Sequence, residues 1–346
     1  MIERIIQEPF SIWTQGSGEF PEIVLSSRIR LARNLKMFPF PSKQTESTAN
    51  AVLERMEKVV SRNKNFKFYR LAELPQLQRQ VLVEKHLISP EHGKDPENRG
   101  LIINADGSVS IMVNEEDHLR IQCFASGLEL EKLAELANQI DNKIEEKIDY
   151  AFDEKYGFLT TCPTNLGTGM RVSVMMHLPG LVLTQQAGRV LHQLSQIGIA
   201  VRGLYGEGTE AWGNLFQISN QISLGQSEKE ILANINSVAR KLISQEEAAR
   251  NYLKENAGLQ IADKANRALG ILTHAKVISS QEALSLISDL RLGKTLGMIE
   301  GYSLKLINEL LLLCQPSYLQ VLAKKEMGPE NRDLKRAEMI KEKLKQ

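Results

Sequence analysis

Cysteine is scarce in this chain of 346 residues, which contains only Cys123, Cys162 and Cys314. Three cysteines so far apart are typical neither of a disulfide framework nor of a CxxC metal site, and they favour the reducing cytoplasm. Net charge is also nearly absent, at +1, so the composition gives no support for general nucleic-acid binding. No apolar run approaches membrane-spanning length, and charges interrupt the N-terminus too early for a signal peptide.

The familiar nucleotide-binding signatures are missing as well. The chain contains no GxxxxGK[ST] loop, no HRD and DFG pair, and no GxGxxG motif after a strand. No dedicated cage for Mg²⁺ is visible either. A nucleotide site in this chain would therefore need other phosphate-binding groups.

Hydrophobic residues make up 42% and charged residues 25% of the chain, a globular profile that allows one large or two ordinary domains. Apolar patterns predict strands over 22–31, 101–104, 109–113, 172–175 and 199–201, with an Asp106-Gly107 hairpin turn. Helical spacing predicts helices over 46–61, 128–149, 185–196, 227–255, 304–313 and 332–345, the last capped by Asn331. We expect an α+β domain over 1–255, with an antiparallel sheet flanked by helices, and an all-helical domain over 256–346.

Five arginines stand at or beside loop-like positions: Arg28, Arg30, Arg120, Arg171 and Arg202. The first two are two residues apart, so on a strand they point to one face. Arginine binds phosphate oxygens bidentately and keeps its charge, so several such side chains could hold a triphosphate. Taken singly, each arginine could equally pair with a surface carboxylate.

Acidic residues cluster at Glu115, Glu116 and Asp117, directly after a predicted strand. Such a cluster could simply be a solvated strand end. Alternatively, it could supply a base beside a cationic acceptor, with Glu207 from a Gly-rich loop as the second carboxylate. Asp117 could instead hold its neighbours in place. Cys162 is either inert filler or, beside threonine hydroxyls, a reactive thiolate.

Together these stretches resemble the catalytic domain of the phosphagen (guanidino) kinases, over residues ~22–250 and in the same order along the chain. The family patterns S-[ST]-R-x-R, N-E-E-D-H-x-R, C-P-[ST]-N-x-G-T-x-x-R and R-G-x-x-G-E occur here at 26–30, 114–120, 162–171 and 202–207. The resemblance implies a phosphagen-kinase-like fold that binds ATP with Mg²⁺ and a guanidinium group.

The resemblance also implies roles for individual residues. Glu116 and Glu207 would hold and deprotonate the guanidinium, with Glu115 and Cys162 beside them, and His86 would lie near the adenine or else be a core histidine. The expected nucleotide contacts are Ser26, Ser27, Arg28, Ile29, Arg30, His86, Arg120, Arg171, Val172, Ser173, Val174, Met175, Arg202, Gly203, Leu204, Tyr205, Gly206 and Glu207. Met175 departs from the family, which often has histidine there.

The ends of the chain depart from the small-molecule kinases. Only about two dozen residues precede Arg28, where those enzymes have a helical domain that covers the substrate. The tail contains an R-D-x-x-R-A motif, with Arg332, Asp333, Arg336 and Ala337, that resembles the phosphoarginine-binding site of the bacterial protein arginine kinases. On a helix the two arginines share a face near its positive N-terminus, which suits phosphate; a solvated basic helix is the alternative.

The resemblance therefore implies a cytoplasmic protein arginine kinase that uses ATP and Mg²⁺, with allosteric control. Its implied partners are proteins with exposed arginines, an activator protein, a Clp ATPase and protease, and a stress-response repressor, without direct nucleic-acid or membrane binding. Apolar helices around 284–313 could form a homodimer contact or ordinary core. The alternatives are a catalytically weak phosphoarginine-binding adaptor and a small-molecule guanidino kinase.

Overall fold

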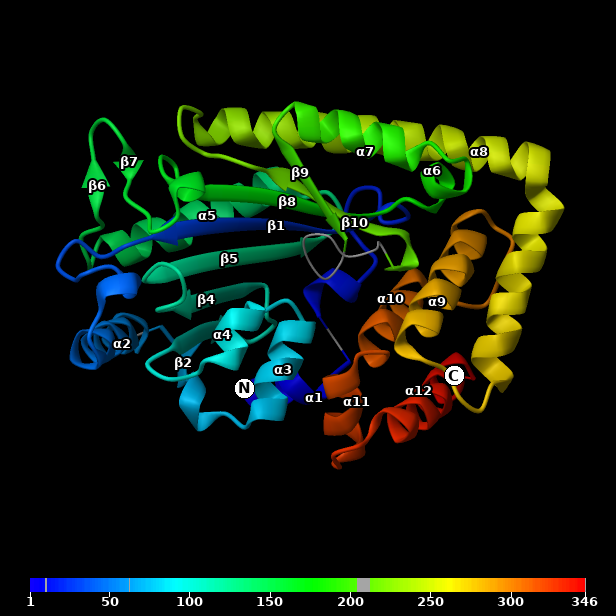
Figure 1. Cartoon of the computed structure of the whole chain (residues 1–346), viewed down its shortest axis with the longest axis horizontal. Coiled ribbons are helices and arrows are strands. Elements are labelled where there is room, and N and C mark those ends of the chain that lie inside the picture. The colour runs from blue at the N-terminus through cyan, green and yellow to red at the C-terminus, as the bar shows by residue number, and fades with distance from the viewer. Residues whose placement is uncertain (10, 62, 204–211, 346) are drawn as a thin grey trace.

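A large antiparallel sheet forms the centre of the molecule (Figure 1). The structure, a computed structural model, describes residues 1–9, 11–61, 63–203 and 212–345. In these residues the strand order is β2-β3-β4-β5-β1-β8-β10-β9, and all neighbours are antiparallel. The strands are β1 (Val24–Arg33), β2 (Phe66–Arg70), β3 (Gly100–Asn104), β4 (Val109–Val113), β5 (Leu119–Ser126), β8 (Met170–His177), β9 (Ile199–Gly203) and β10 (Leu215–Asn220), and a separate ribbon pairs β6 (Phe152–Asp153) with β7 (Gly157–Phe158). The expected antiparallel sheet is confirmed.

Helices surround this sheet and form the whole C-terminal part of the chain (Figure 1). They are α1 (Ile2–Gln7), α2 (Glu46–Val60), α3 (Gln76–Glu84), α4 (Pro90–Lys94), α5 (Leu130–Glu145), α6 (Pro179–Leu183), α7 (Ala187–Gln196), α8 (Glu228–His274), α9 (Ser280–Thr295), α10 (Leu304–Leu313), α11 (Pro316–Ala323) and α12 (Pro329–Leu344). Short 3-10 turns lie at Ile12–Thr14, Pro41–Lys43, Leu71–Glu73, Pro163–Asn165 and Trp212–Asn214.

Two helix boundaries differ from the sequence-based expectation. The capping box at Ser227 and Glu230 opens α8 as predicted, but the helix continues past 255 to His274, with a non-helical residue at Ala257. Figure 1 shows it turning sharply between its two halves. The last helix begins at Pro329 rather than after Asn331, because proline at the first helical position needs no hydrogen-bond partner for its nitrogen.

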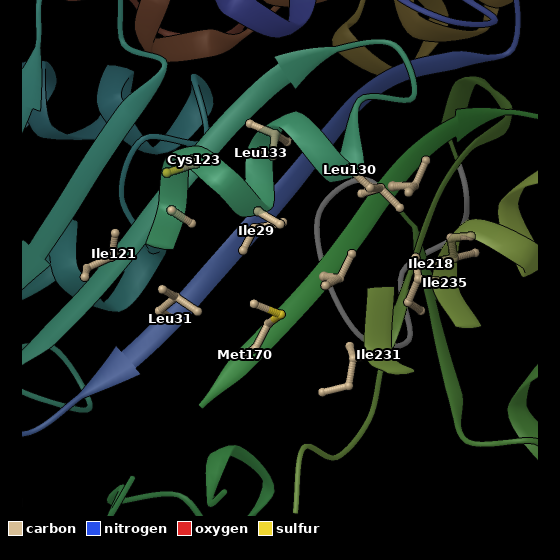
Figure 2. Close-up of a cluster of buried hydrophobic side chains, with 14 of the residues drawn as sticks. Ile29, Leu31, Ile121, Cys123, Leu130, Leu133, Met170, Ile218, Ile231 and Ile235 are labelled. Carbon is tan, nitrogen blue, oxygen red and sulfur yellow. The ribbon is translucent and has the colours of Figure 1, made fainter. Parts of the chain in front are cut away.

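One face of the sheet is mostly apolar and packs against α5 and the first half of α8 (Figure 2). Strand alternation produces this face, because every second side chain points the same way. Figure 2 labels Ile29, Leu31, Ile121, Cys123, Leu130, Leu133, Met170, Ile218, Ile231 and Ile235, which are all nearly inaccessible to solvent. Each large side chain buried here contributes about 1.5–3 kcal/mol, and the sheet is thereby held rigid.

A second core joins the C-terminal helices to the N-terminal segment. It contains Ile6, Trp13 and Leu25 together with Leu311 and Tyr318. The apolar residues of α9 and α10 are buried in this core, so they are ordinary core and give no support to a dimer contact. Within the described residues no single helix is long and apolar enough to cross a membrane; α10 and α11 reach that composition only as a pair bent by 89°.

A buried arginine fastens the C-terminal helices to the sheet. Arg291 of α9 is 1% exposed. Its guanidinium donates to Pro21 O at 2.7 Å, to Glu22 O at 2.8 Å, to His177 Nδ1 at 2.9 Å and to Asn308 Oδ1 at 3.1 Å. Burial and the charges of nearby arginines hold the pKa of His177 well below its ordinary value, so the neutral ring accepts at Nδ1. One side chain thus satisfies acceptors from both parts of the chain.

We predict that Arg291→Met lowers the free energy of unfolding by about 3–5 kcal/mol, because its acceptors remain buried without a donor. Urea denaturation measures this change. Arg267→Met, on the exposed side of α8, is the matched control and should stay within about 0.5 kcal/mol of the parent. Equal stability of the two variants would contradict the role of Arg291.

Candidate active site

The second face of the sheet gathers the predicted arginines. Arg28 and Arg30 occupy alternate positions of β1, as their spacing predicted, and Arg30 lies directly opposite Arg171 of β8. Arg120 of β5 is opposite the next β1 residue on this face. Directly opposed residues project from the same side of a sheet, and the charge of Arg202 on β9 also acts on Arg28. We call these five residues the arginine face.

Neutral polar groups help to orient two of these guanidinium groups. Arg28 donates from Nε to Ser173 Oγ at 3.3 Å and from Nη2 to Gln217 Oε1 at 3.2 Å. Arg171 donates from Nε and Nη2 to Ser219 Oγ at 3.3 and 3.0 Å. Hydroxyl and amide oxygens fix the direction of a guanidinium without cancelling its charge.

Burial and mutual repulsion act strongly on two members of the arginine face, Arg28 and Arg30. Burial, then the charges of Arg120, Arg171 and Arg202, lowers the pKa of Arg28 to about 9. Burial and neighbouring guanidinium groups hold the pKa of Arg30 well below its ordinary value. Arg30 Nε is buried and has no hydrogen-bond partner in the described part of the chain. Such a surface fits a polyanion such as a nucleotide polyphosphate, whose oxygens accept these hydrogen bonds.

Glu115 neutralises one of the five arginines. Its two carboxylate oxygens each accept from Arg120 Nη1 at 2.7 Å, and Ser89 Oγ donates to it at 2.7 Å. Burial alone would raise the pKa of Glu115, but the Arg120 charge and these hydrogen bonds lower it to about 2. This carboxylate therefore stays ionised and orients Arg120 toward the arginine face.

Asp117 holds the two predicted catalytic segments together. It is 2% exposed and accepts from Asn34 Nδ2 at 2.6 Å and from the Thr161 amide at 2.7 Å. A tight turn, closed by a hydrogen bond from the Asn114 amide to His118 O at 2.9 Å, surrounds it. The alternative that Asp117 positions its neighbours is what the structure shows.

Glu116 is the exposed carboxylate of the cluster. Partial burial and the two adjacent carboxylates raise its pKa, against the charge of Arg120 and a hydrogen bond from the Cys162 side chain. Cys162 Sγ also lies 3.1 Å from Thr164 Oγ1. The structure thus brings together a carboxylate and a thiol that are 46 residues apart in the sequence (162 − 116), beside the arginine face.

Some predicted nucleotide contacts point away from the arginine face. The side chains of Ser27, Ile29, Val172 and Val174 are buried on the opposite side, where Ser27 Oγ donates to Gly127 O at 2.7 Å. Their positions follow from strand alternation, and they support the neighbouring arginines from beneath. Gly203 ends β9, and the predicted residues Leu204, Tyr205, Gly206 and Glu207 lie outside the described residues.

His86 lies in a narrow pocket that adjoins Arg28 and is also lined by Trp13, Ser26 and Met175. Burial, and secondarily the Arg28 charge, lowers the pKa of His86 to about 4, so its ring is neutral near pH 7. The ring centroids of His86 and Trp13 are 5.8 Å apart. At this separation the two rings pack against each other, beside Arg28 of the arginine face.

Sequence reasoning missed a cavity of about 470 Å³ that Glu116 helps to line. We call it the acidic cleft; its principal lining residues are Glu46, Glu97, Asn114, Glu115, Glu116 and Thr161. These residues come from the start of α2, the segment before β3, the 114–118 turn and the 160–165 loop. No motif connects the four segments in the sequence, so only the fold could identify the cleft.

The residues of the tail motif differ in burial: some pack into the core, and others lie nearer the surface. Arg336 is 2% exposed, and it donates to Cys314 O at 2.9 Å, to Ile278 O at 2.8 Å and to Asp333 Oδ1. Ala337 is buried in the same core. Arg332 lies half-buried in the first turns of α12, so it is the arginine of this motif that is better placed to meet a ligand.

Comparisons with known proteins agree with this geometry. The family model for the ATP:guanido phosphotransferase C-terminal catalytic domain matches residues 47–249, and that for the protein-arginine kinase McsB C-terminal domain matches 258–346. Proteins named protein-arginine kinase are similar over nearly the full length. Identity is 51% to that of Symbiobacterium thermophilum, covering 99% of this chain and 98% of the relative, and 46% to that of Halothermothrix orenii, covering 99% of each.

Solved structures of guanidino kinases have a similar fold. The crystal structure of lombricine kinase superposes with a TM-score of 0.60 at 26% identity, covering 68% of each chain. The duplicated taurocyamine kinase from Schistosoma mansoni, with bound transition state analog components, has a TM-score of 0.60 at 27% identity. It covers 65% of this chain and 33% of the other.

We predict that Arg30→Gln raises ligand-free stability by about 1 kcal/mol, because it removes a buried, poorly compensated charge. The same variant should bind ATP at least about tenfold more weakly, through the loss of charge-assisted hydrogen bonds. Thermal unfolding and calorimetric titration measure the two effects.

The control is Arg33→Gln on the same strand. Arg33 is buried but donates to Asp141 at 2.7 Å, so its loss leaves an unpaired carboxylate and should destabilise by about 3–5 kcal/mol. A ligand-free Arg30→Gln protein that melts as early as the Arg33→Gln protein would contradict the charge-repulsion account.

Proposed function

This chain belongs to the ATP:guanido phosphotransferase family and is a protein-arginine kinase, and we propose that Glu116, Cys162 and the arginine face perform its reaction. The observation that supports this assignment most directly is that Glu116 lines an acidic cleft and also lies within reach of the charge of Arg120, which belongs to the arginine face. The cleft suits a cationic acceptor. An exposed arginine of another protein would enter it while ATP lies on the arginine face.

The reaction requires a proton to leave the acceptor. A guanidinium nitrogen forms a bond to the γ-phosphorus, the bond from that phosphorus to the β,γ-bridging oxygen breaks, and ADP departs with the electron pair. Arginine has a pKa of about 13.8, so removing its proton beforehand at pH 7 costs about 9 kcal/mol. Proton transfer to a carboxylate must therefore accompany N–P bond formation.

Glu116 is the base in this proposal. It is exposed toward the cleft, and its raised pKa makes it a better proton acceptor than an ordinary glutamate. Glu115 is held by Arg120 with a pKa of about 2, so it is a poor base and a good anchor. Cys162 would contact the acceptor guanidinium beside Glu116. By the family pattern Glu207, which lies outside the described residues, supplies a second carboxylate.

The arginine face would bind the ATP phosphates and stabilise the charge that spreads over the transferred phosphoryl oxygens. The guanidinium groups of Arg28 and Arg171 are already oriented by serine and glutamine side chains and that of Arg120 by Glu115, which limits the reorganisation that the reaction needs. ATP is expected to arrive with Mg²⁺, which neutralises part of its charge. Among the described residues, no three His, Cys, Asp or Glu side chains gather closely enough to hold a metal ion.

The cellular role belongs to the same proposal. Phosphoarginine would mark proteins for a Clp ATPase and protease, and a stress-response repressor would be one substrate, as the resemblance implies. An activator protein and a homodimer are further expected partners. Three free thiols suit the cytoplasm. The tail motif supports this role, because a phosphoarginine site would let the enzyme bind its own product.

We predict that Glu116→Gln folds and binds ATP within about twofold of the parent but loses about 10²–10⁴ in kcat toward protein arginine. Because the base must be ionised and its pKa is raised, the parental rate should fall as pH drops through a value above the ordinary glutamate range. Turnover is measured with ATP and an arginine-rich protein, by a readout that preserves the acid-labile N–P bond.

Free arginine in the same assay separates the alternatives. Phosphorylation of free arginine alone would indicate a small-molecule kinase. Binding of phosphoarginine without any turnover would indicate an adaptor. Undiminished turnover by Glu116→Gln would remove that residue from the mechanism.

We also predict that Arg332→Ala weakens binding of free phosphoarginine by about tenfold or more while the melting temperature stays unchanged. Titration calorimetry measures the affinity. Arg336→Ala should instead unfold more easily, because Cys314 O and Ile278 O lose their donor. An unaltered isotherm for Arg332→Ala would exclude the tail as the phosphoarginine site.

A further inference from the structure

The acidic cleft contains more acceptor groups than one catalytic carboxylate requires. Glu46 and Glu97 line it together with Glu115 and Glu116. The cleft includes one cation, Arg99, whose Nη1 donates to the backbone oxygen of a neighbouring residue. Among its described lining residues the cavity therefore has an excess of negative charge.

Two buried oxygens of the cleft lack a donor. Asn114 is 6% exposed, and its Nδ2 donates to Ala49 O at 3.0 Å and to Asn98 O at 2.9 Å. Because both partners are carbonyl acceptors, the amide cannot be turned around, so its oxygen is the atom left over. Asn114 Oδ1 and Thr161 Oγ1 have no hydrogen-bond partner within the described residues. An N–H donor from outside would satisfy them.

Glu46 and Glu97 are available to such a ligand. Both side chains are exposed, and neither makes an ion pair with another described residue. Glu46 stands in the first turn of α2. Neither residue belongs to the segments that hold Glu116, Cys162 or the arginines, so the transfer reaction leaves them unused.

We infer that the acidic cleft binds a second basic side chain, lysine or arginine, of the same substrate polypeptide that presents its acceptor arginine to Glu116. This inference rests on the proposed function and deepens it. Ammonium and guanidinium groups offer only donors, which matches a site made of carboxylates and unpartnered oxygens. The cleft selects substrates in which a basic residue neighbours the acceptor, and it disfavours acidic neighbours by charge repulsion.

The test compares peptides with one acceptor arginine that have either lysine or glutamine at the neighbouring positions. The parent should show a kcat/KM at least about tenfold higher for the lysine peptides, mainly through KM. In the double variant Glu46→Gln with Glu97→Gln this preference should fall to about twofold or less. The control is Glu54→Gln with Glu57→Gln, an equal change of charge at exposed positions of α2 that do not line the cleft; it should keep the preference.

Fluorescence anisotropy of a labelled lysine peptide whose acceptor arginine is replaced by glutamine gives a readout independent of turnover. The parent and the control variant should bind it at least about fivefold more tightly than the Glu46 and Glu97 variant. Equal binding by all three proteins would overturn the inference, even if phosphorylation of protein arginine is confirmed. Binding differences without any turnover would support the cleft and contradict the proposed reaction. If the control variant lost the preference to the same extent, the preference would come from the general surface charge, and the inference would be wrong.

Discussion

Arg28 and Arg30 lie beside Arg120 and Arg171 on a half-buried sheet face, and the repulsion among these charges constrains everything built around them. The sheet can hold such a surface because its opposite face buries a continuous apolar core against α5 and α8. Because side chains alternate along each strand, one face of the sheet stabilises the fold by burying apolar side chains, while the other face carries the arginines. Because the repulsion among the arginines destabilises the ligand-free protein, a polyanion that reduces this repulsion binds more favourably.

The three acids that follow Asn114 show how position alone separates their chemistry. Glu115 is paired with Arg120 and has a pKa of about 2, while Asp117 accepts hydrogen bonds from two other segments. Only Glu116 points outward, with a raised pKa and the Cys162 side chain beside it. A tight turn thus directs three neighbouring carboxylates to different surroundings: Glu115 to Arg120, Asp117 to the segments around Asn34 and Thr161, and Glu116 to the cleft, where the proposed reaction needs a base.

Local patterns in the sequence predicted β1, β3, β4, β8 and β9 but missed β2, β5 and β10. The two-residue spacing of Arg28 and Arg30 correctly predicted that they share a face. The meeting of these residues with Arg120, Arg171 and Arg202 depends on strand register across long stretches of chain, so only the family resemblance could indicate it. The burial of Arg336 was not predictable, because its acceptors are backbone oxygens from two other helix ends. The acidic cleft could not be predicted either, because the four segments that line it share no motif in the sequence.

The C-terminal helices do more than extend the chain, because they form part of the pocket around His86. Leu311 and Gln315 line this pocket together with Trp13, and Glu84, two residues before His86, accepts hydrogen bonds from the amides of Ser317 and Tyr318 at 2.8 Å each. The charge of Arg332 acts on the same carboxylate and opposes the rise in its pKa caused by burial. Glu84 thus fixes α11 to α3, next to the segment that carries His86. The C-terminal helices therefore help to position the residues at this end of the arginine face.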